Sequence, residues 1–389
     1  MHYINQQGWT DTATWLIILR EDFEIMKQAA FTPEVIGKDA QRYSDAFLTF
    51  RHETMHFWQA ISTSFLYSYS CNYVNFCIDA LNAVRHGGKG YADIPFTEFQ
   101  SKFNELTELL LSPSQTIRTI DVIEGCAVFC AYRMNFPHAS HEGFLRHLDE
   151  GHSGQREYRN AYLFATKMLG EPAFELFAPA CYISLQGDNP GRNLETILLY
   201  AKDGLQFASH YDIFDDPLSF LLEEAHMQEE GCFPFVVARS LPQFTQGYFS
   251  HPVLQPYIEK IAQTTNLRLS DIFARPYLYE NNSHDEISDF LSDMYPPMHV
   301  YSGRTALLMG LGQRLGKDYS IIIHHLTAIV GLASRLVFDN RTQMLCPHHS
   351  CPVYKTNLCQ GYLAFPLDDY KKCKFPELLE GIELGKLLQ

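Results

Sequence analysis

The motif that constrains this chain most is the pentad His52-Glu53-Thr54-Met55-His56, an HExxH pattern. It lies in a stretch without glycine or proline from residue 38 to residue 86, and its apolar residues recur at helical spacing. Residues four apart share one face of a helix, so His52 and His56 can reach one metal ion. Glu53 can approach a water at that metal, an arrangement that makes a hydroxide nucleophile near neutral pH.

The surroundings of the pentad favour a metal site over an accidental match. A chance HExxH is conceivable in a chain with 17 histidines. The flanking residues 47–51 and 57–61 are mainly apolar, however, so the pentad belongs to an apolar helix rather than to a charged surface. Burying two histidines and a glutamate is costly unless they are paired, and a metal ion would pair them.

A catalytic zinc site takes three protein ligands and leaves one position open, so a third ligand should come from a later helix. The best candidate is Glu124, at the centre of the apolar, helix-forming segment 119–129. Gly125 beside it allows another helix to approach closely. The alternative is that Glu124 is a buried acid paired with Arg133, or an acid near a helix N-terminus.

HExxH followed by a helix with Glu-Gly-x-Ala resembles the gluzincin metallopeptidases. The resemblance covers two short segments, residues 45–65 and 117–135. It implies a zinc-dependent hydrolase of peptides or proteins, with His52, His56 and Glu124 as ligands and Glu53 as general base. The distance from Glu53 to Glu124 along the chain is longer than in compact members, which implies an inserted helical segment.

The resemblance also implies a short edge strand before the metal helix, where an extended peptide can pair. The apolar run 15–19, rich in strand formers, is the candidate for that strand, although it could equally be a plain core strand.

Hydrolysis at zinc also needs a hydrogen-bond donor for the oxyanion. The segment 295–304 is the richest source, and its candidates are His299, Tyr301 and Arg304. Related families carry a His-Pro where this chain has Tyr295, so a turn leading into a helix remains the alternative. Gln59, one turn beyond His56, either lines the site or satisfies a buried polar group.

A second metal site is expected in the C-terminal tail. Four cysteines and two histidines lie within about thirty residues there, a spacing typical of structural zinc. An iron–sulfur cluster is less favoured than zinc because the spacing matches no standard ferredoxin run, and the alternative to a metal site is a set of free thiols. The expected ligands are Cys346, His348 or His349, Cys351, Cys359 and Cys373. The other six cysteines lie singly in apolar segments and are expected to be free thiols.

Composition narrows the function classes. The net charge of −15 over 389 residues argues against nonspecific nucleic-acid binding, which needs a cationic surface. The first residues lack the pattern of a signal peptide. The most apolar later stretch, 319–338, holds two histidines and an arginine, so a buried helix is expected rather than a membrane span. A cytoplasmic protein is the default expectation, with its oligomeric state open.

The fold class expected is mainly α with a small N-terminal β element (α+β). We expect a zincin-like core with extra helices in residues 1–340, and a Cys/His-rich metal-binding tail in residues 341–389. The first helix is too long to be straight and should break near residues 68–70. Helices are predicted at 43–85, 96–111, 119–134, 156–168, 193–209, 217–230, 252–264, 284–294, 303–315 and 318–338.

Two other functions remain open. Glu53 and His56 also form an ExxH pair, and Glu223 with His226 forms a second. Two such pairs plus two further glutamates describe a di-iron carboxylate bundle with oxidase or oxygenase activity. That reading leaves His52 without a role. The other possibility is a zinc-binding protein without catalysis.

Overall fold

The computed structural model describes residues 8–10, 15, 17–19, 40–86, 96–112, 116–136, 138–206, 217–218, 220–221, 298–302, 305–309, 343–345 and 362–364. These residues are mostly helical. None of the helices in this part of the chain is long and apolar enough to cross a membrane.

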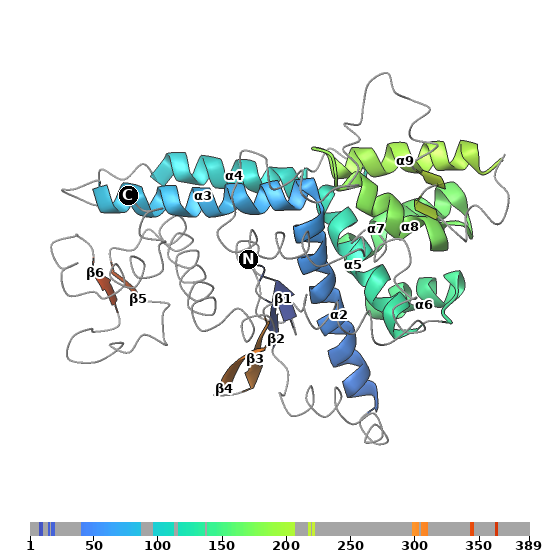
Figure 1. Cartoon of the computed structure of the whole chain (residues 1–389), viewed down its shortest axis with the longest axis horizontal. Helices are drawn as coiled ribbons and strands as arrows, with labels where there is room; N and C mark the ends of the chain where they lie inside the picture. Colours follow the sequence, from blue (N-terminus) through green and yellow to red (C-terminus); the bar gives the residue numbers. More distant parts are fainter. Residues whose placement is uncertain are drawn as a thin grey trace, which may run out of the picture.

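Two antiparallel helices form the centre of the described structure: α2 (Ala40–Ser62) and α5 (Thr119–Asn135), which lie side by side in Figure 1. Most residues of α5 are buried, as expected for a helix that is apolar on all sides. Polar side chains of α2 donate hydrogen bonds to backbone carbonyls of α5 at two positions along the helix pair. The Arg51 guanidinium donates to the Met134 carbonyl, and the Gln59 amide donates to the Ile123 carbonyl.

The first turn of α5 is fixed by the buried carboxylate of Asp121. This carboxylate accepts the backbone N–H of Arg118 at 3.1 Å and also binds the Arg118 guanidinium. The amide of Asn160 donates to it at 2.9 Å. A carboxylate in the first turn satisfies free N–H groups and suits the helix dipole. The anchor lies one turn before Glu124 and therefore sets the position of that residue.

Four further helices surround α5: α6 (His141–Gly151), α7 (Arg156–Leu169), α8 (Ala173–Ser184) and α9 (Pro190–Gly204). Gly125 lets α7 approach closely, since a Cβ at this position would lie 3.4 Å from the Ala161 Cβ. Phe129 packs against several aromatic rings, including Tyr162 at 5.4 Å and Phe144 at 5.0 Å between ring centroids.

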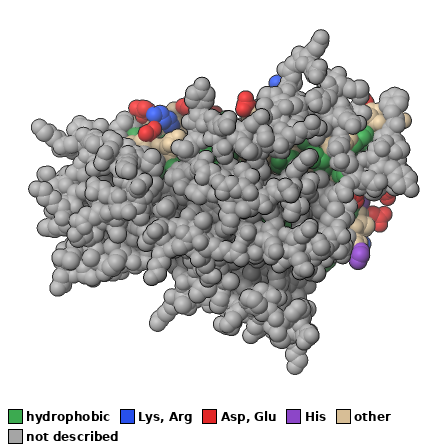
Figure 2. All heavy atoms as spheres, viewed as in Figure 1, with side chains coloured by type: hydrophobic (Ala, Val, Ile, Leu, Met, Phe, Trp, Pro, Cys, Tyr) green, Lys and Arg blue, Asp and Glu red, His purple; other side chains and the backbone are tan. Residues whose placement is uncertain are grey.

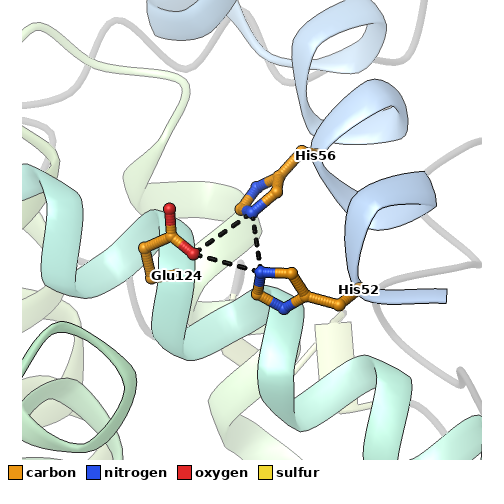
Figure 3. A group of neighbouring side chains, drawn as sticks. All are labelled: His52, His56 and Glu124. Atoms are coloured by element: carbon orange, nitrogen blue, oxygen red, sulfur yellow. Dashed lines mark hydrogen bonds and ion pairs between the residues drawn. The ribbon is translucent and has the colours of Figure 1, made fainter. Parts of the chain in front are cut away.

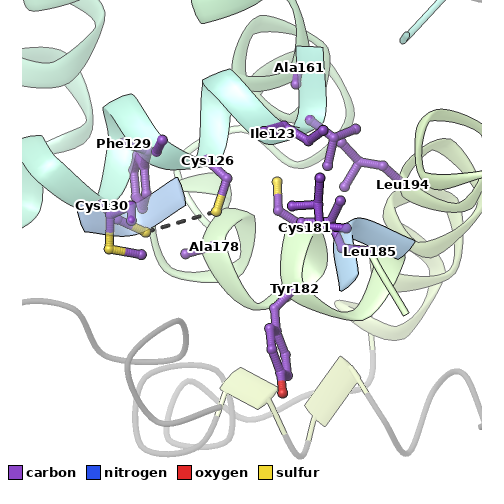
Figure 4. Close-up of a cluster of buried hydrophobic side chains, with 14 of the residues drawn as sticks. Ile123, Cys126, Phe129, Cys130, Ala161, Ala178, Cys181, Tyr182, Leu185 and Leu194 are labelled. Carbon is purple, nitrogen blue, oxygen red and sulfur yellow. Dashed lines mark hydrogen bonds between the residues drawn. The ribbon is translucent and has the colours of Figure 1, made fainter. Parts of the chain in front are cut away.

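The core between α5 and α8 also contains three thiols (Figure 4). Cys126 and Cys130, one turn apart on α5, have their sulfur atoms 4.0 Å apart, and Cys181 of α8 is drawn close to Cys126. All five described cysteines are free and buried, as expected for thiols that act as small hydrophobes. Cys232 lies outside the described residues.

The long first helix breaks at Thr63 and not near residues 68–70 as predicted, so that α3 (Ser64–His86) follows α2 directly. The break has a tertiary cause. The Phe65 N–H donates to the Leu185 carbonyl at 3.0 Å, and the Gln186 side chain binds the backbone of Ser64 at 3.2 Å and that of Ser62 at 3.3 Å. The end of α8 thus satisfies the backbone groups that the break exposes.

Helix α4 (Phe96–Leu111) packs along α3, and the two form the elongated pair in Figure 1. Their contact includes Phe76, whose ring lies 6.2 Å from Phe99 and 6.1 Å from Phe103. The outer face of α4 is polar, and Figure 2 shows acidic and basic side chains together over it. One exposed pair there joins Lys102 and Glu98 at 3.1 Å.

The described strands form two small sheets. The first has the order β1 (Gly8–Thr10), β2 (Ile17–Leu19), β3 (Met298–Ser302) and β4 (Thr305–Met309). Strand β2 runs antiparallel to β1 and parallel to β3, with Ile18 opposite Trp9 and His299. The second sheet pairs β5 (Gln343–Leu345) with β6 (Tyr362–Ala364).

Two sequence predictions bear on this sheet, and one of them is wrong. The strand expected at residues 15–19 is β2, which has a neighbour on each side and is therefore the core strand of the two alternatives; the strand at the edge beside α2 is β1. The helix expected at 303–315 contains strand β4 at Thr305–Met309. Its apolar run is short, and such a run suits a strand as well as a buried helix.

The other helix predictions divide into three groups. Those at 96–111, 119–134 and 156–168 agree with α4, α5 and α7 to within one residue at either end. Helix α9 begins at Pro190, three residues earlier than predicted, because Asn189 caps it. The predicted helices at 217–230, 252–264, 284–294 and 318–338 lie wholly or largely outside the described residues; of the first, residues 217–218 and 220–221 are described, and they are helical.

Candidate metal centre

Three side chains from α2 and α5 converge on one point (Figure 3). The Nε2 atoms of His52 and His56 lie 3.0 Å apart, and the Glu124 Oε2 lies 3.2 Å from each. Ligand atoms 2.0–2.2 Å from a tetrahedral zinc ion are separated by about 3.3–3.6 Å. The spacing of the three donor atoms is close to this range, and the group could hold a metal ion.

Helix geometry accounts for this convergence. His52 and His56 are one turn apart and present their rings edge to face, with centroids 4.6 Å apart. Glu124 faces them from the antiparallel helix. The alternative that Glu124 pairs with Arg133 is wrong. The Arg133 guanidinium lies against α8 instead, where it donates to the Phe174 carbonyl at 3.0 Å and to the Glu175 carboxylate at 3.3 Å.

The electrostatics of the group are those of a cation site. Burial disfavours a charged His56, but the Glu124 carboxylate and its hydrogen bond outweigh this and raise the pKa of His56 to about 9. Burial alone would raise the pKa of Glu124, yet the two imidazoles hold it far below its ordinary range. Without a metal the carboxylate therefore stays ionised and attracts positive charge to the triangle of donor atoms formed by His52, His56 and Glu124. A divalent cation supplies more positive charge there than a proton does.

Glu53 lies beside the triangle and is not one of its corners. Its carboxylate is buried and accepts a 2.6 Å hydrogen bond from the Thr10 hydroxyl on β1. Strand β1 comes this close because residue 8 is glycine: a Cβ there would lie 2.8 Å from Thr49 and 3.3 Å from the Glu53 Cγ. Glu53 is thus held next to the site by a residue from the start of the chain.

A cavity of about 470 Å³ opens next to His52 and Glu53. Its described lining has an apolar part from α2 and α5 and a polar part from α2, α6, α7 and the loop between α6 and α7. The apolar side chains are Leu48, Val128 and Ala131. The remaining lining residues, besides His52 and Glu53, are Gly8, Asp45, Thr49, His147, Gly151, His152, Gln155 and Tyr158.

Three ring side chains of this wall form a row that starts at the metal centre. Tyr158 meets the His52 ring edge to face at 5.6 Å, His152 lies 5.0 Å from Tyr158, and His147 lies 5.4 Å from His152. Burial, followed by the negative charges of Glu124 and Glu53, raises the pKa of Tyr158 well above its ordinary value. Burial and the neighbouring His152 lower the pKa of His147 to about 4. All three rings are therefore favoured in their neutral forms at pH 7.

Sequence reasoning missed this row because no motif marks it. Tyr158 lies on a helix that was predicted, but only the packing of α7 against α5 brings it to His52. His147 and His152 come from the end of α6 and the residue after it. A cluster of histidines just before a predicted helix was the available signal.

The side chains of the other predicted site residues lie outside the described structure. The backbone of His299 and Tyr301 lies in β3, which β2 separates from β1. Arg304 lies outside the described residues. So do the five tail ligands, Cys346, His349, Cys351, Cys359 and Cys373, and the second ExxH pair, Glu223 and His226. Those assignments stay predictions.

No protein-family model, curated protein or solved structure matches the chain, so the comparisons with known proteins assign it to no family.

Proposed function

We propose that this chain is a zinc-dependent peptidase whose metal is held by His52, His56 and Glu124. The observation that carries the proposal is the triangle of donor atoms, 3.0–3.2 Å apart, with a second acidic residue, Glu53, beside it that is not a corner. Two imidazoles and one carboxylate form a ligand set found in catalytic zinc sites. We propose in addition that α2, α5 and the β1–β4 sheet form a zincin-like core.

Glu53 has the position of a general base. A zinc ion bound by the triangle would polarise the substrate carbonyl and increase the acidity of water. The Glu53 carboxylate, on the cavity wall, would take the proton of the attacking water and pass it to the departing amine. The hydrogen bond from Thr10 orients that carboxylate without protonating it.

Tyr158 is our candidate for the donor to the oxyanion. Its ring contacts His52 and lines the same cavity as Glu53. Because its pKa is raised, the phenol keeps its proton at neutral pH and can donate it in a hydrogen bond to a developing negative charge. His299, Tyr301 and Arg304 remain the candidates from sequence, and substitution of each residue can rank them.

The arrangement favours one metal over a di-iron pair. In a di-iron bundle Glu53 would be a ligand and His52 would have no role. Among the described residues, the ligand atoms that gather are those of His52, His56 and Glu124. The Glu53 carboxylate is bound to the Thr10 hydroxyl instead.

The proposal is tested with Glu53→Gln, which keeps the side-chain shape and removes its basicity. Zinc content by elemental analysis should equal that of the wild type, and melting temperature should change little. Cleavage of a mixed library of fluorogenic peptides should fall by at least about a hundredfold. A variant that retains zinc and cleaves at the wild-type rate would refute the mechanism. Loss of metal from the variant would instead favour Glu53 as a ligand.

A further inference from the structure

Gln59 is a polar residue with no exposed surface at the interface between α2 and α5. Its side chain makes hydrogen bonds in opposite directions. One end lies 3.1 Å from the His56 Nδ1, and the other donates to the Ile123 carbonyl at 3.1 Å. Ile123 directly precedes Glu124, so one side chain contacts a metal ligand on α2 and the backbone next to a metal ligand on α5.

The chemistry of the partners fixes the direction of the amide. A backbone carbonyl only accepts hydrogen bonds, so the NH₂ end of Gln59 must face Ile123. The carbonyl end must then face His56, and an amide oxygen also only accepts. The proton of the His56 ring is therefore required on Nδ1, which leaves the lone pair of Nε2 for the point between His52 and Glu124.

We propose that Gln59 is a positioning residue of the metal centre, which orients the His56 imidazole for the metal, whereas its contact with the Ile123 carbonyl serves the packing of α5 on α2. This inference rests on the metal site of the proposed function. It assigns to Gln59 an effect on metal affinity that is distinct from its effect on folding. Partners behind a metal-bound histidine orient the ring and raise its basicity, and removing them typically costs 10–100-fold in metal affinity.

Two substitutions separate the contacts of Gln59. Gln59→Met has a similar length and makes neither hydrogen bond. Gln59→Glu keeps an acceptor for the His56 Nδ1 but places a carboxylate oxygen against the Ile123 carbonyl. Ser62→Ala is the matched control, because Ser62 is equally buried on α2 and its hydroxyl donates at 2.6 Å within that helix, to the Trp58 carbonyl.

Zinc dissociation constants are measured by competition with a chromophoric chelator, and melting temperatures are measured on the metal-free proteins. We expect Gln59→Met to weaken zinc binding by about 10–100-fold. Gln59→Glu should melt at a lower temperature than the wild type but bind zinc within about threefold of it, since the His56 contact survives. Ser62→Ala should bind zinc as the wild type does. Cobalt(II) provides a spectroscopic check, and its visible absorption should change in Gln59→Met but not in Ser62→Ala.

Wild-type zinc affinity in a folded Gln59→Met variant would overturn the inference. If that variant does not fold, Gln59→Glu decides alone: affinity close to the wild type supports the inference, and a loss above about tenfold overturns it. Failure of the proposed metal site looks different, because His56→Ala would then bind as much zinc as the wild type, and both proposals would fall.

Discussion

The Thr10 hydroxyl donates a 2.6 Å hydrogen bond to the carboxylate of Glu53, 43 residues further along the chain. The same hydroxyl lies 3.2 Å from the Glu53 backbone carbonyl. Strand β1 is thereby joined to α2 at the residue next to the metal ligand His52. The start of the chain is therefore part of the candidate site, and changes in β1 should affect catalysis.

Thr10→Val should reduce kcat/KM by about tenfold, because a hydrogen bond to a charged group contributes roughly 1.5 kcal/mol. Zinc content should not change, since Thr10 touches no ligand of the triangle. Thr10→Ser keeps the hydroxyl and should retain most of the activity. Equal kinetics for the valine and serine variants would show that the hydrogen bond does not matter to the reaction.

Tyr158→Phe should lower kcat by roughly 10–100-fold while KM and zinc affinity change little, because the lost hydroxyl serves the transition state. The measurement is steady-state kinetics on one peptide substrate. Tyr301→Phe and His299→Ala are the parallel variants. If Tyr301→Phe causes the larger loss of kcat, the oxyanion donor is in β3 and the assignment to Tyr158 is wrong.

Lowering the pH should destabilise the fold through His147. Burial and the neighbouring His152 lower the pKa of His147 from 6.5 to about 4 in the folded state. Between these values the unfolded chain binds a proton that the folded chain does not, so stability falls as the pH drops from 6.5 towards 4. His147→Gln should flatten this part of the profile in urea unfolding, whereas His138→Gln, an exposed control, should leave it unchanged. A profile for His147→Gln as steep as that of the wild type would refute the prediction.

Gly125 should tolerate a methyl group but not a larger side chain. A Cβ would lie 3.4 Å from the Ala161 Cβ and 3.6 Å from the Phe177 ring. For Gly125→Ala, the gain in helix propensity and the tight contact should nearly cancel. Gly125→Leu should destabilise the fold by about 1–3 kcal/mol through overpacking, and should weaken zinc binding because Glu124 moves with the backbone. Urea unfolding and chelator competition test the two effects separately, and a stable Gly125→Leu variant would contradict the packing of α5 on α7.

Local pattern was enough to predict the residues that form the triangle. The HExxH spacing places His52 and His56 on one helical face, and an acid within an apolar helix indicated Glu124. Both depend on helix periodicity, which short-range sequence determines. The same periodicity located α4, α5 and α7.

Features set by distant partners could not be predicted in this way. The break at Thr63 depends on the Leu185 carbonyl and Gln186, more than a hundred residues away. Helix α8 is apolar on nearly every face and contains Pro179, so it has neither a clear period nor an uninterrupted helical sequence. Tyr158 and Thr10 reach the site only through packing of α7 and β1 against the two central helices.

The most direct test of the metal centre is the number of zinc ions bound per chain, measured by elemental analysis on four proteins after identical dialysis. His56→Ala and Glu124→Ala should each lose one equivalent relative to the wild type. His152→Asn, which changes a histidine on the cavity wall outside the triangle, should lose none. Each variant is compared with the wild type, so zinc bound in the C-terminal tail contributes equally to both and does not affect the difference. Equal zinc content in His56→Ala and the wild type would contradict the account.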